Sequence, residues 1–141
     1  MRKVFFIVLV SALFLSCTKE TIIYQGADVN TYYFDVYPHQ WKTWGDYDHV
    51  GYYCYAEGNL NAITNSVIES GGVFAYVIID NYDRILPDIE PFFDNGYFSR
   101  VIRYDLLRGK ITFIIEDSDF KTPFPPVNGK LTFKVIVLSK R

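Results

Sequence analysis

Short segments in which apolar and polar residues alternate run through most of this chain. A period of two residues is the pattern of a β-strand that buries one face against a core. Two such segments, residues 31–37 and 131–138, lie near opposite ends of the sequence. Their apolar positions are Tyr32, Phe34 and Val36 in the first segment, and Leu131, Phe133, Val135 and Val137 in the second.

Several such strands separated by turns predict an all-β fold, an antiparallel β-sandwich of the immunoglobulin-like kind. The abundance of Tyr and Phe, 12 of each, favours strands over helices. Residues 73–79 are apolar throughout, which indicates a central strand. Only residues 60–69 have apolar positions at helical spacing, with Asn59 as a possible cap and Gly71 as a stop. We therefore expect one short helix there.

The first 17 residues, MRKVFFIVLVSALFLSC, have the features of a bacterial export signal. Two positive residues precede twelve residues that are apolar apart from Ser11. A membrane-spanning helix needs about 20 apolar residues, whereas an export signal needs about 7–15. Residues 14–17, Phe-Leu-Ser-Cys, resemble the lipobox of bacterial lipoproteins, which implies cleavage before Cys17 and attachment of palmitate-like acyl chains there. The alternative is an ordinary secretory signal in which Cys17 is incidental.

This interpretation divides the chain into three parts. Residues 1–16 are the cleaved signal peptide, residues 17–30 the lipidated N-terminus and tether, and residues 31–141 the sandwich domain. Thr18 does not resemble a signal for retention at the inner membrane. We therefore expect a protein held by lipid at the outer membrane, facing either the periplasm or the cell surface.

The composition excludes several classes of partner and site. The predicted mature chain of 125 residues has 12 Lys and Arg against 16 Asp and Glu, a net charge of −4. Because no basic stripe is present, we expect no nucleic-acid partner. No motif indicates a cofactor. Cys54 has no second cysteine to pair with once Cys17 carries lipid, and its apolar neighbours predict that it is buried.

A series of short motifs, in this order and spacing, is similar to small lipoproteins of the Bacteroidota. The resemblance covers nearly the whole mature domain and implies a secreted, lipid-anchored all-β protein. It implies no catalytic residues. The motifs are Tyr33, Pro38, Gln40-Trp41, Gly72-Val73, Ala75-Tyr76-Val77, Leu86-Pro87, Ile111-Thr112-Phe113, Ile115, Asp117-Ser118-Asp119 and Phe133-Lys134-Val135.

The polar and aromatic loop at residues 39–49 is the first candidate site. Trp41, Trp44 and Tyr47 are placed to form an aromatic platform for sugar rings, because amphipathic aromatic side chains supply contact area at low entropic cost. Asp46 and Asp48 would accept hydrogen bonds from sugar hydroxyls. The alternative is that Trp41 closes one end of the sandwich and the other two rings pack over it. The acidic residues and the two histidines of this loop match no zinc-binding spacing, so we expect no metal site.

The acidic loop that contains Asp117 and Asp119 is the second candidate. These residues would supply carboxylates for glycoside hydrolysis with Glu57 or Asp46, a reaction that needs two carboxyl groups across a cleft. The alternative is a turn in which the side chains bond their own backbone.

The sequence thus favours a non-enzymatic envelope module that binds a glycan or a protein. A small hydrolase acting on glycan or peptidoglycan, and a purely structural lipoprotein, are the alternatives.

Overall fold

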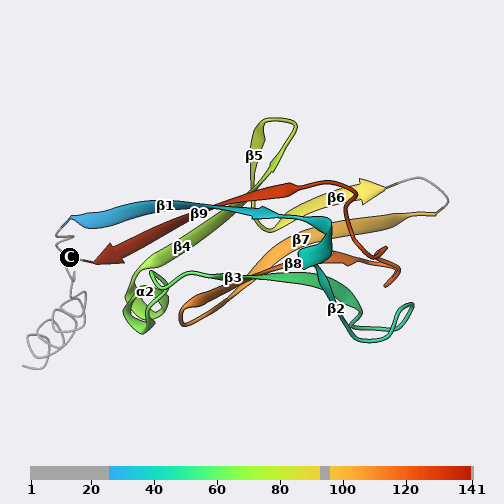
Figure 1. Ribbon diagram of the computed structural model, residues 1–141, viewed down its shortest axis with the longest axis horizontal. Coiled ribbons are helices and arrows are strands. Elements are labelled where there is room, and N and C mark those ends of the chain that lie inside the picture. Colours follow the sequence, from blue (N-terminus) through green and yellow to red (C-terminus); the bar gives the residue numbers. More distant parts are fainter. Residues whose placement is uncertain (1–25, 93–95, 141) are drawn as a thin grey trace, which may run out of the picture.

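The computed structural model describes residues 26–92 and 96–140, which form two antiparallel sheets packed face to face (Figure 1). The predicted antiparallel β-sandwich is therefore confirmed. The signal sequence and Cys17 lie outside the described residues. Sheet A has the strand order β1-β9-β4-β5 and sheet B the order β2-β3-β8-β7-β6. The strands are β1 (Ala27–Val36), β2 (Lys42–Trp44), β3 (Tyr53–Asn59), β4 (Gly72–Ile79), β5 (Tyr82–Ile85), β6 (Asp88–Phe92), β7 (Phe98–Leu107), β8 (Lys110–Asp117) and β9 (Leu131–Lys140).

The two segments with the clearest alternation pair with each other in sheet A. β1 and β9 run antiparallel over ten residue pairs, with Phe34 opposite Phe133. The predicted inward side chains face the core: Val36, Phe133, Val135 and Val137 are buried, and Tyr32, Phe34 and Leu131 are partly buried against it. β1 begins at Ala27, inside the segment that the sequence assigns to the tether.

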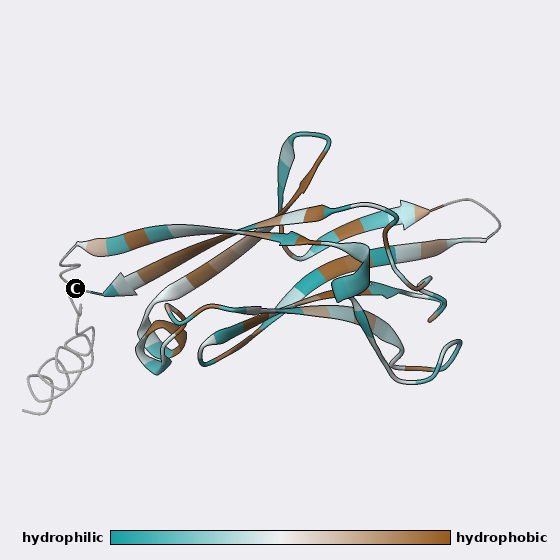
Figure 2. Cartoon of the chain, in the orientation of Figure 1, coloured by the Kyte–Doolittle hydropathy of each residue, from teal (hydrophilic) through white to brown (hydrophobic). Residues whose placement is uncertain are grey.

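The core lies between the sheets and is centred on two stacked phenylalanines. The rings of Phe113 in β8 and Phe133 in β9 lie 3.9 Å apart with an interplanar angle of 10°. Gly58 allows Phe34 to enter this layer, since a Cβ at position 58 would lie 2.7 Å from the Phe34 ring. Figure 2 shows hydrophobic and polar residues alternating along the strands that enclose this core.

The helix is shorter than predicted and begins later. α2 spans Asn65–Ser70, and Thr64 is its N-cap, whose hydroxyl accepts a hydrogen bond of 3.2 Å from the Val67 N–H. Asn59 does not cap it, because Asn59 is still paired with β8. As predicted, Gly71 ends the helix. Within residues 26–92 and 96–140, no helix is long and apolar enough to cross a membrane.

The chain changes sheets between β5 and β6. The turn at Asp80-Asn81 has positive φ at both residues, as in the type I′ turns that favour Asn and Asp. Figure 1 shows the β4–β5 hairpin standing out from the two sheets. The chain then leaves β5 at Leu86, whose N–H donates to the Ala75 carbonyl at 2.9 Å, and enters sheet B at Asp88.

Candidate functional site

The outer face of sheet B carries three aromatic side chains on two neighbouring strands. Cys54 and Ala56 face the core, so Tyr53 and Tyr55 point outward from β3. Trp44 of β2 lies opposite Tyr53 in the ladder and shares that face. Together these rings border a hollow of about 260 Å³, here called the outer-face hollow. It is lined by Trp44, Tyr53, Tyr55, Glu57, Asp105, Thr112 and Ile114.

The hollow has an apolar base and an aromatic edge. Ile114 lies opposite Tyr55 and is only 2% exposed although it belongs to the outer face. The rings of Tyr53 and Tyr55 meet edge to face, with centroids 6.2 Å apart. Trp44 is 62% exposed. This arrangement leaves a large indole surface free beside two tyrosines whose positions are fixed by β3.

Two lysines hold the carboxylate of Glu57 at the edge of the hollow. Lys42 Nζ lies 3.0 Å from Glu57 Oε2, and Lys110 Nζ lies 2.9 Å from Glu57 Oε1. These hydrogen bonds lower the pKa of Glu57 below its ordinary value, and the bond from Lys110 has the larger effect. Glu57 therefore remains an ionised hydrogen-bond acceptor well into the acid range.

Arg103 of β7 does not line the hollow but contacts two residues that do, Asp105 and Tyr53. Its guanidinium lies 3.1 Å from Asp105 Oδ1 and 3.7 Å from Glu116 Oε2. The same group lies 5.6 Å from the centroid of the Tyr53 ring, within the range of a cation–π contact. Lys42 lies similarly over Tyr55, at 5.8 Å. The cations and carboxylates around the hollow thus neutralise one another.

The structure corrects the expected position of Trp41. Its side chain is 2% exposed and packs edge to face on Phe133, with ring centroids 6.5 Å apart. Trp41 follows the 3₁₀ turn η2 (Pro38–Gln40) and points inward, whereas Trp44 points outward from β2. It belongs to the core, as the alternative interpretation of this loop has it, and it is not part of a surface platform.

The other predicted residues of this loop lie beyond the hollow. Tyr47 is exposed, but its ring packs on Tyr52 at a centroid distance of 5.4 Å. Asp48 pairs with Lys121 at 3.4 Å, and the carboxylate of Asp46 is exposed. None of the three lines the outer-face hollow. In the part of the chain that the structure describes, no three His, Cys, Asp or Glu residues converge to hold a metal ion.

The acidic loop separates its two candidate carboxylates. Asp117 ends β8, is 2% exposed, and accepts two hydrogen bonds of 2.8 Å from the guanidinium of Arg100. Asp119 accepts the Lys121 N–H at 3.2 Å, which is the local turn of the alternative interpretation. Asp117 faces the interior of sheet B and Glu57 its exterior, so these two carboxylates cannot flank one substrate.

The sequence analysis missed Tyr53, Tyr55, Asp105 and Ile114 of the lining, and Arg103 beside it. The alternation around Cys54 contains the signal for the tyrosines, because a buried cysteine places its neighbours on the opposite face. Arg103 comes beside Tyr53 only because sheet B pairs strands that are distant in the sequence. No local sequence pattern predicts that pairing. No protein-family model, curated protein or solved structure matches this chain. The candidate site therefore rests on the geometry of its residues.

Proposed function

We propose that this chain is a lipid-anchored, non-enzymatic binding module of the outer membrane that holds a neutral glycan in the outer-face hollow. The observation that supports the proposal is the meeting of Trp44, Tyr53 and Tyr55 at one hollow. The C–H face of a sugar ring packs on such aromatic surfaces, whose rigid side chains lose little entropy on binding. Glu57, Asp105 and Thr112 supply hydrogen-bonding groups for the hydroxyls.

The charge balance of the hollow favours a neutral ligand. Each carboxylate of Glu57 and Asp105 already has a cationic partner within 3.1 Å. An anionic glycan would have to compete with these carboxylates for Lys42, Lys110 and Arg103. A neutral sugar bonds to the paired groups without separating them.

A hydrolase is less well supported by the same geometry. Glu57 and Asp105 share the hollow, but glycoside hydrolysis needs one carboxyl that stays protonated near neutral pH. The lysine hydrogen bonds lower the pKa of Glu57, which is the opposite of what a general acid requires. The pair therefore suits hydrogen bonding to a bound sugar better than proton donation.

The proposed lipid anchor on Cys17 is tested by metabolic labelling with a fatty acid. Cells fed an alkyne-bearing palmitate should label the chain, and Cys17→Ser should abolish the label. Protease treatment of intact cells then distinguishes the two faces of the outer membrane, because only a surface-exposed domain is digested. Labelling that persists in Cys17→Ser would contradict the lipid anchor.

The glycan proposal is tested by titration calorimetry of the full chain carrying Cys17→Ser, purified in detergent. The probes are soluble neutral polysaccharides, namely a β-glucan, a xylan and a mannan, with a polyuronate as the charged comparison. We expect heat with at least one neutral polymer, and a loss of about tenfold or more in affinity for Trp44→Ala and Tyr55→Ala.

Tyr33→Ala is the matched control, because Tyr33 is 65% exposed on the outer face of sheet A. It should leave the affinity unchanged. Tyr47→Ala separates the hollow from the neighbouring loop and should also bind normally. The proposal fails if no neutral polysaccharide binds, or if the Trp44 variant binds as tightly as the parent.

A further inference from the structure

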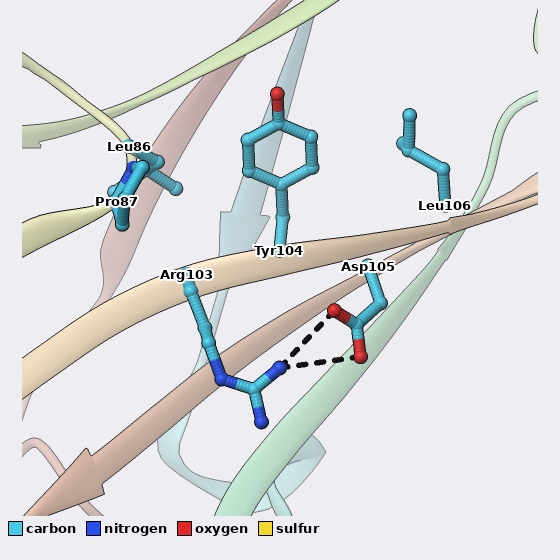
Figure 3. A pocket seen from close by; sticks show the side chains of 6 residues that line it. All are labelled: Leu86, Pro87, Arg103, Tyr104, Asp105 and Leu106. Carbon is cyan, nitrogen blue, oxygen red and sulfur yellow. Dashed lines mark hydrogen bonds and ion pairs between the residues drawn. The ribbon is translucent and has the colours of Figure 1, made fainter. Parts of the chain in front are cut away.

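The two sheets of this sandwich are incompletely covered along one side. In sheet B, β6 pairs with β7 only from Phe98 to Ile102, and β7 continues for five residues to Leu107. Beside this free stretch lies a cavity of about 650 Å³, here called the edge cavity. Figure 3 shows the side chains that line it: Leu86, Pro87, Arg103, Tyr104, Asp105 and Leu106.

The register shows which backbone groups of β7 point toward the edge cavity. Leu107 pairs with Lys110 across a two-residue turn, and such a turn closes on a hydrogen-bonded pair. Alternation then directs the backbone groups of Leu107, Asp105 and Arg103 to β8. The N–H and C=O groups of Tyr104 and Leu106 point the other way, to the free edge. The position of Pro91 agrees, because this residue without an N–H falls at a non-hydrogen-bonded site opposite Ser99.

These four backbone groups are not used by the described part of the chain. Residues 26–92 and 96–140 provide them with no hydrogen-bond partner. Sheet A differs at the corresponding place: the Val73 carbonyl accepts the Tyr104 hydroxyl at 2.8 Å, and the Ala75 carbonyl accepts the Leu86 N–H. In sheet A, two carbonyls of the open edge are thus bonded internally, whereas the described residues leave the corresponding backbone groups of sheet B without a partner.

The side chains around the vacant edge define what fits there. Tyr104 and Leu106 point to one side of β7, and Arg103 and Asp105 to the other (Figure 3). On the first side, Leu86 is 6% exposed and gives the cavity an apolar wall. A strand placed beside β7 shares its pleat, so its residues opposite Tyr104 and Leu106 face this apolar side. The residue between them faces the charged pair.

We propose that β7 accepts an extended peptide segment from a partner protein, which adds as a sixth strand to sheet B along residues 103–107. The segment has apolar residues at two alternate positions, which enter the edge cavity, and a polar residue between them. An extended backbone is the ligand whose donors and acceptors repeat at the spacing of the Tyr104 and Leu106 groups. This inference does not rest on the glycan proposal: Asp105 borders both sites, but the aromatic rings of Trp44, Tyr53 and Tyr55 line only the outer-face hollow, and Leu86, Tyr104 and Leu106 line only the edge cavity.

The test uses a blocked peptide of sequence KTVTVTK, titrated into the full chain carrying Cys17→Ser in detergent. We expect the amide protons of Tyr104 and Leu106 to gain about tenfold or more protection from hydrogen exchange, measured by NMR. A peptide N-methylated at alternate residues, on the edge that faces β7, should not bind. The proposal fails if the peptide leaves these two amides unprotected, or if it protects those of β1 instead.

A proline substitution tests the same edge from the side of the protein. Leu106→Pro removes an N–H that β8 does not use, and it should lower the peptide affinity about tenfold or more. Ile89→Pro is the matched control, because its N–H faces away from β7 in an edge strand that already contains Pro91. Equal losses in both variants would overturn the proposal. If Leu106→Pro does not fold, the N-methylated peptide still tests the proposal on the unmodified edge, because binding of that peptide would overturn it.

Discussion

The hydroxyl of Tyr104 donates a hydrogen bond of 2.8 Å to the carbonyl of Val73 and so joins the two sheets across the open side of the sandwich. Tyr104 belongs to β7 of sheet B and Val73 to β4 of sheet A. Burial raises the pKa of the Tyr104 phenol, so this donor keeps its proton throughout the neutral range. The bond satisfies an edge carbonyl that no strand covers.

Tyr104→Phe should therefore lower the free energy of unfolding by about 1–3 kcal/mol, because the Val73 carbonyl loses its partner. Urea denaturation followed by circular dichroism measures the change. Tyr82→Phe is the control, since Tyr82 is 72% exposed and should change stability by less than about 0.5 kcal/mol. Equal stability of the two variants would show that the bond contributes nothing.

The buried pair of Arg100 and Asp117 should contribute far more than the ion pairs at the surface. Asp117→Asn leaves the Arg100 guanidinium largely buried and without its countercharge, and we expect a loss of about 3 kcal/mol in unfolding free energy. Asp105→Asn breaks an ion pair whose carboxylate is 64% exposed and should cost less than about 1 kcal/mol. Urea denaturation of both variants provides the comparison. A small effect at Asp117 would contradict the assigned role.

The thiol of Cys54 should respond to pH as a buried group. Burial raises the pKa of Cys54 to about 11, so the folded state disfavours the thiolate. The resulting stabilisation is complete below the ordinary thiol pKa and is lost as the pH rises through that value toward 11. In the Cys17→Ser chain, iodoacetamide should label Cys54 only slowly at pH 8. Cys54→Ala should have a flatter stability profile between pH 8 and 10, and identical profiles would refute the assignment.

The two tryptophans should be distinguishable by fluorescence. Trp41 is almost fully buried against Phe133, whereas Trp44 is mostly exposed. The Trp44→Phe variant, which retains Trp41, should emit at shorter wavelength and resist quenching by acrylamide. The Trp41→Phe variant should emit at longer wavelength and be quenched readily. Similar quenching of the two variants would contradict their placement.

Glycan affinity should withstand mild acid because of the lysines around Glu57. Their hydrogen bonds lower the pKa of Glu57 below the ordinary value of 4.5. The carboxylate, and with it the affinity, is present above this lowered pKa and is lost only as the pH falls through it. Titration calorimetry should give a constant affinity from pH 7 to 5. Glu57→Gln should bind more weakly at every pH, and a decline already between pH 7 and 5 would contradict this prediction.

The architecture could be predicted because it follows from alternation. The apolar positions of β1 and β9 indicate both the strands and the faces that they bury, and each strand bears its pattern in its own residues. The predicted helix begins too early, because Asn59 stays in the ladder with β8 and residues 60–63 form a turn that bonds to the backbone of Gly109. These non-local hydrogen bonds delay the helix to the cap at Thr64.

The candidate site was only partly predictable, because it is assembled from distant strands. Trp44 was found from composition, yet Trp41, three residues earlier, is buried because it points to the other side of the chain. Asp117 resembled a surface carboxylate until its pairing with Arg100 was known, and that contact joins residues 17 positions apart. Sequence spacing along one loop therefore could not say which side chains share a surface.

The pairing of β1 with β9 sets the order in which sheet A can assemble. β9 lies between β1 and β4 and provides the ladder partner of both over most of their lengths. A growing chain has Ala27 among its first residues, but this strand has no place to bind until residues 131–140 follow more than a hundred residues later. Such non-local closure slows folding. If the chain is exported as proposed, through a channel that passes unfolded polypeptides, β1 is still without its ladder partner when it enters that channel.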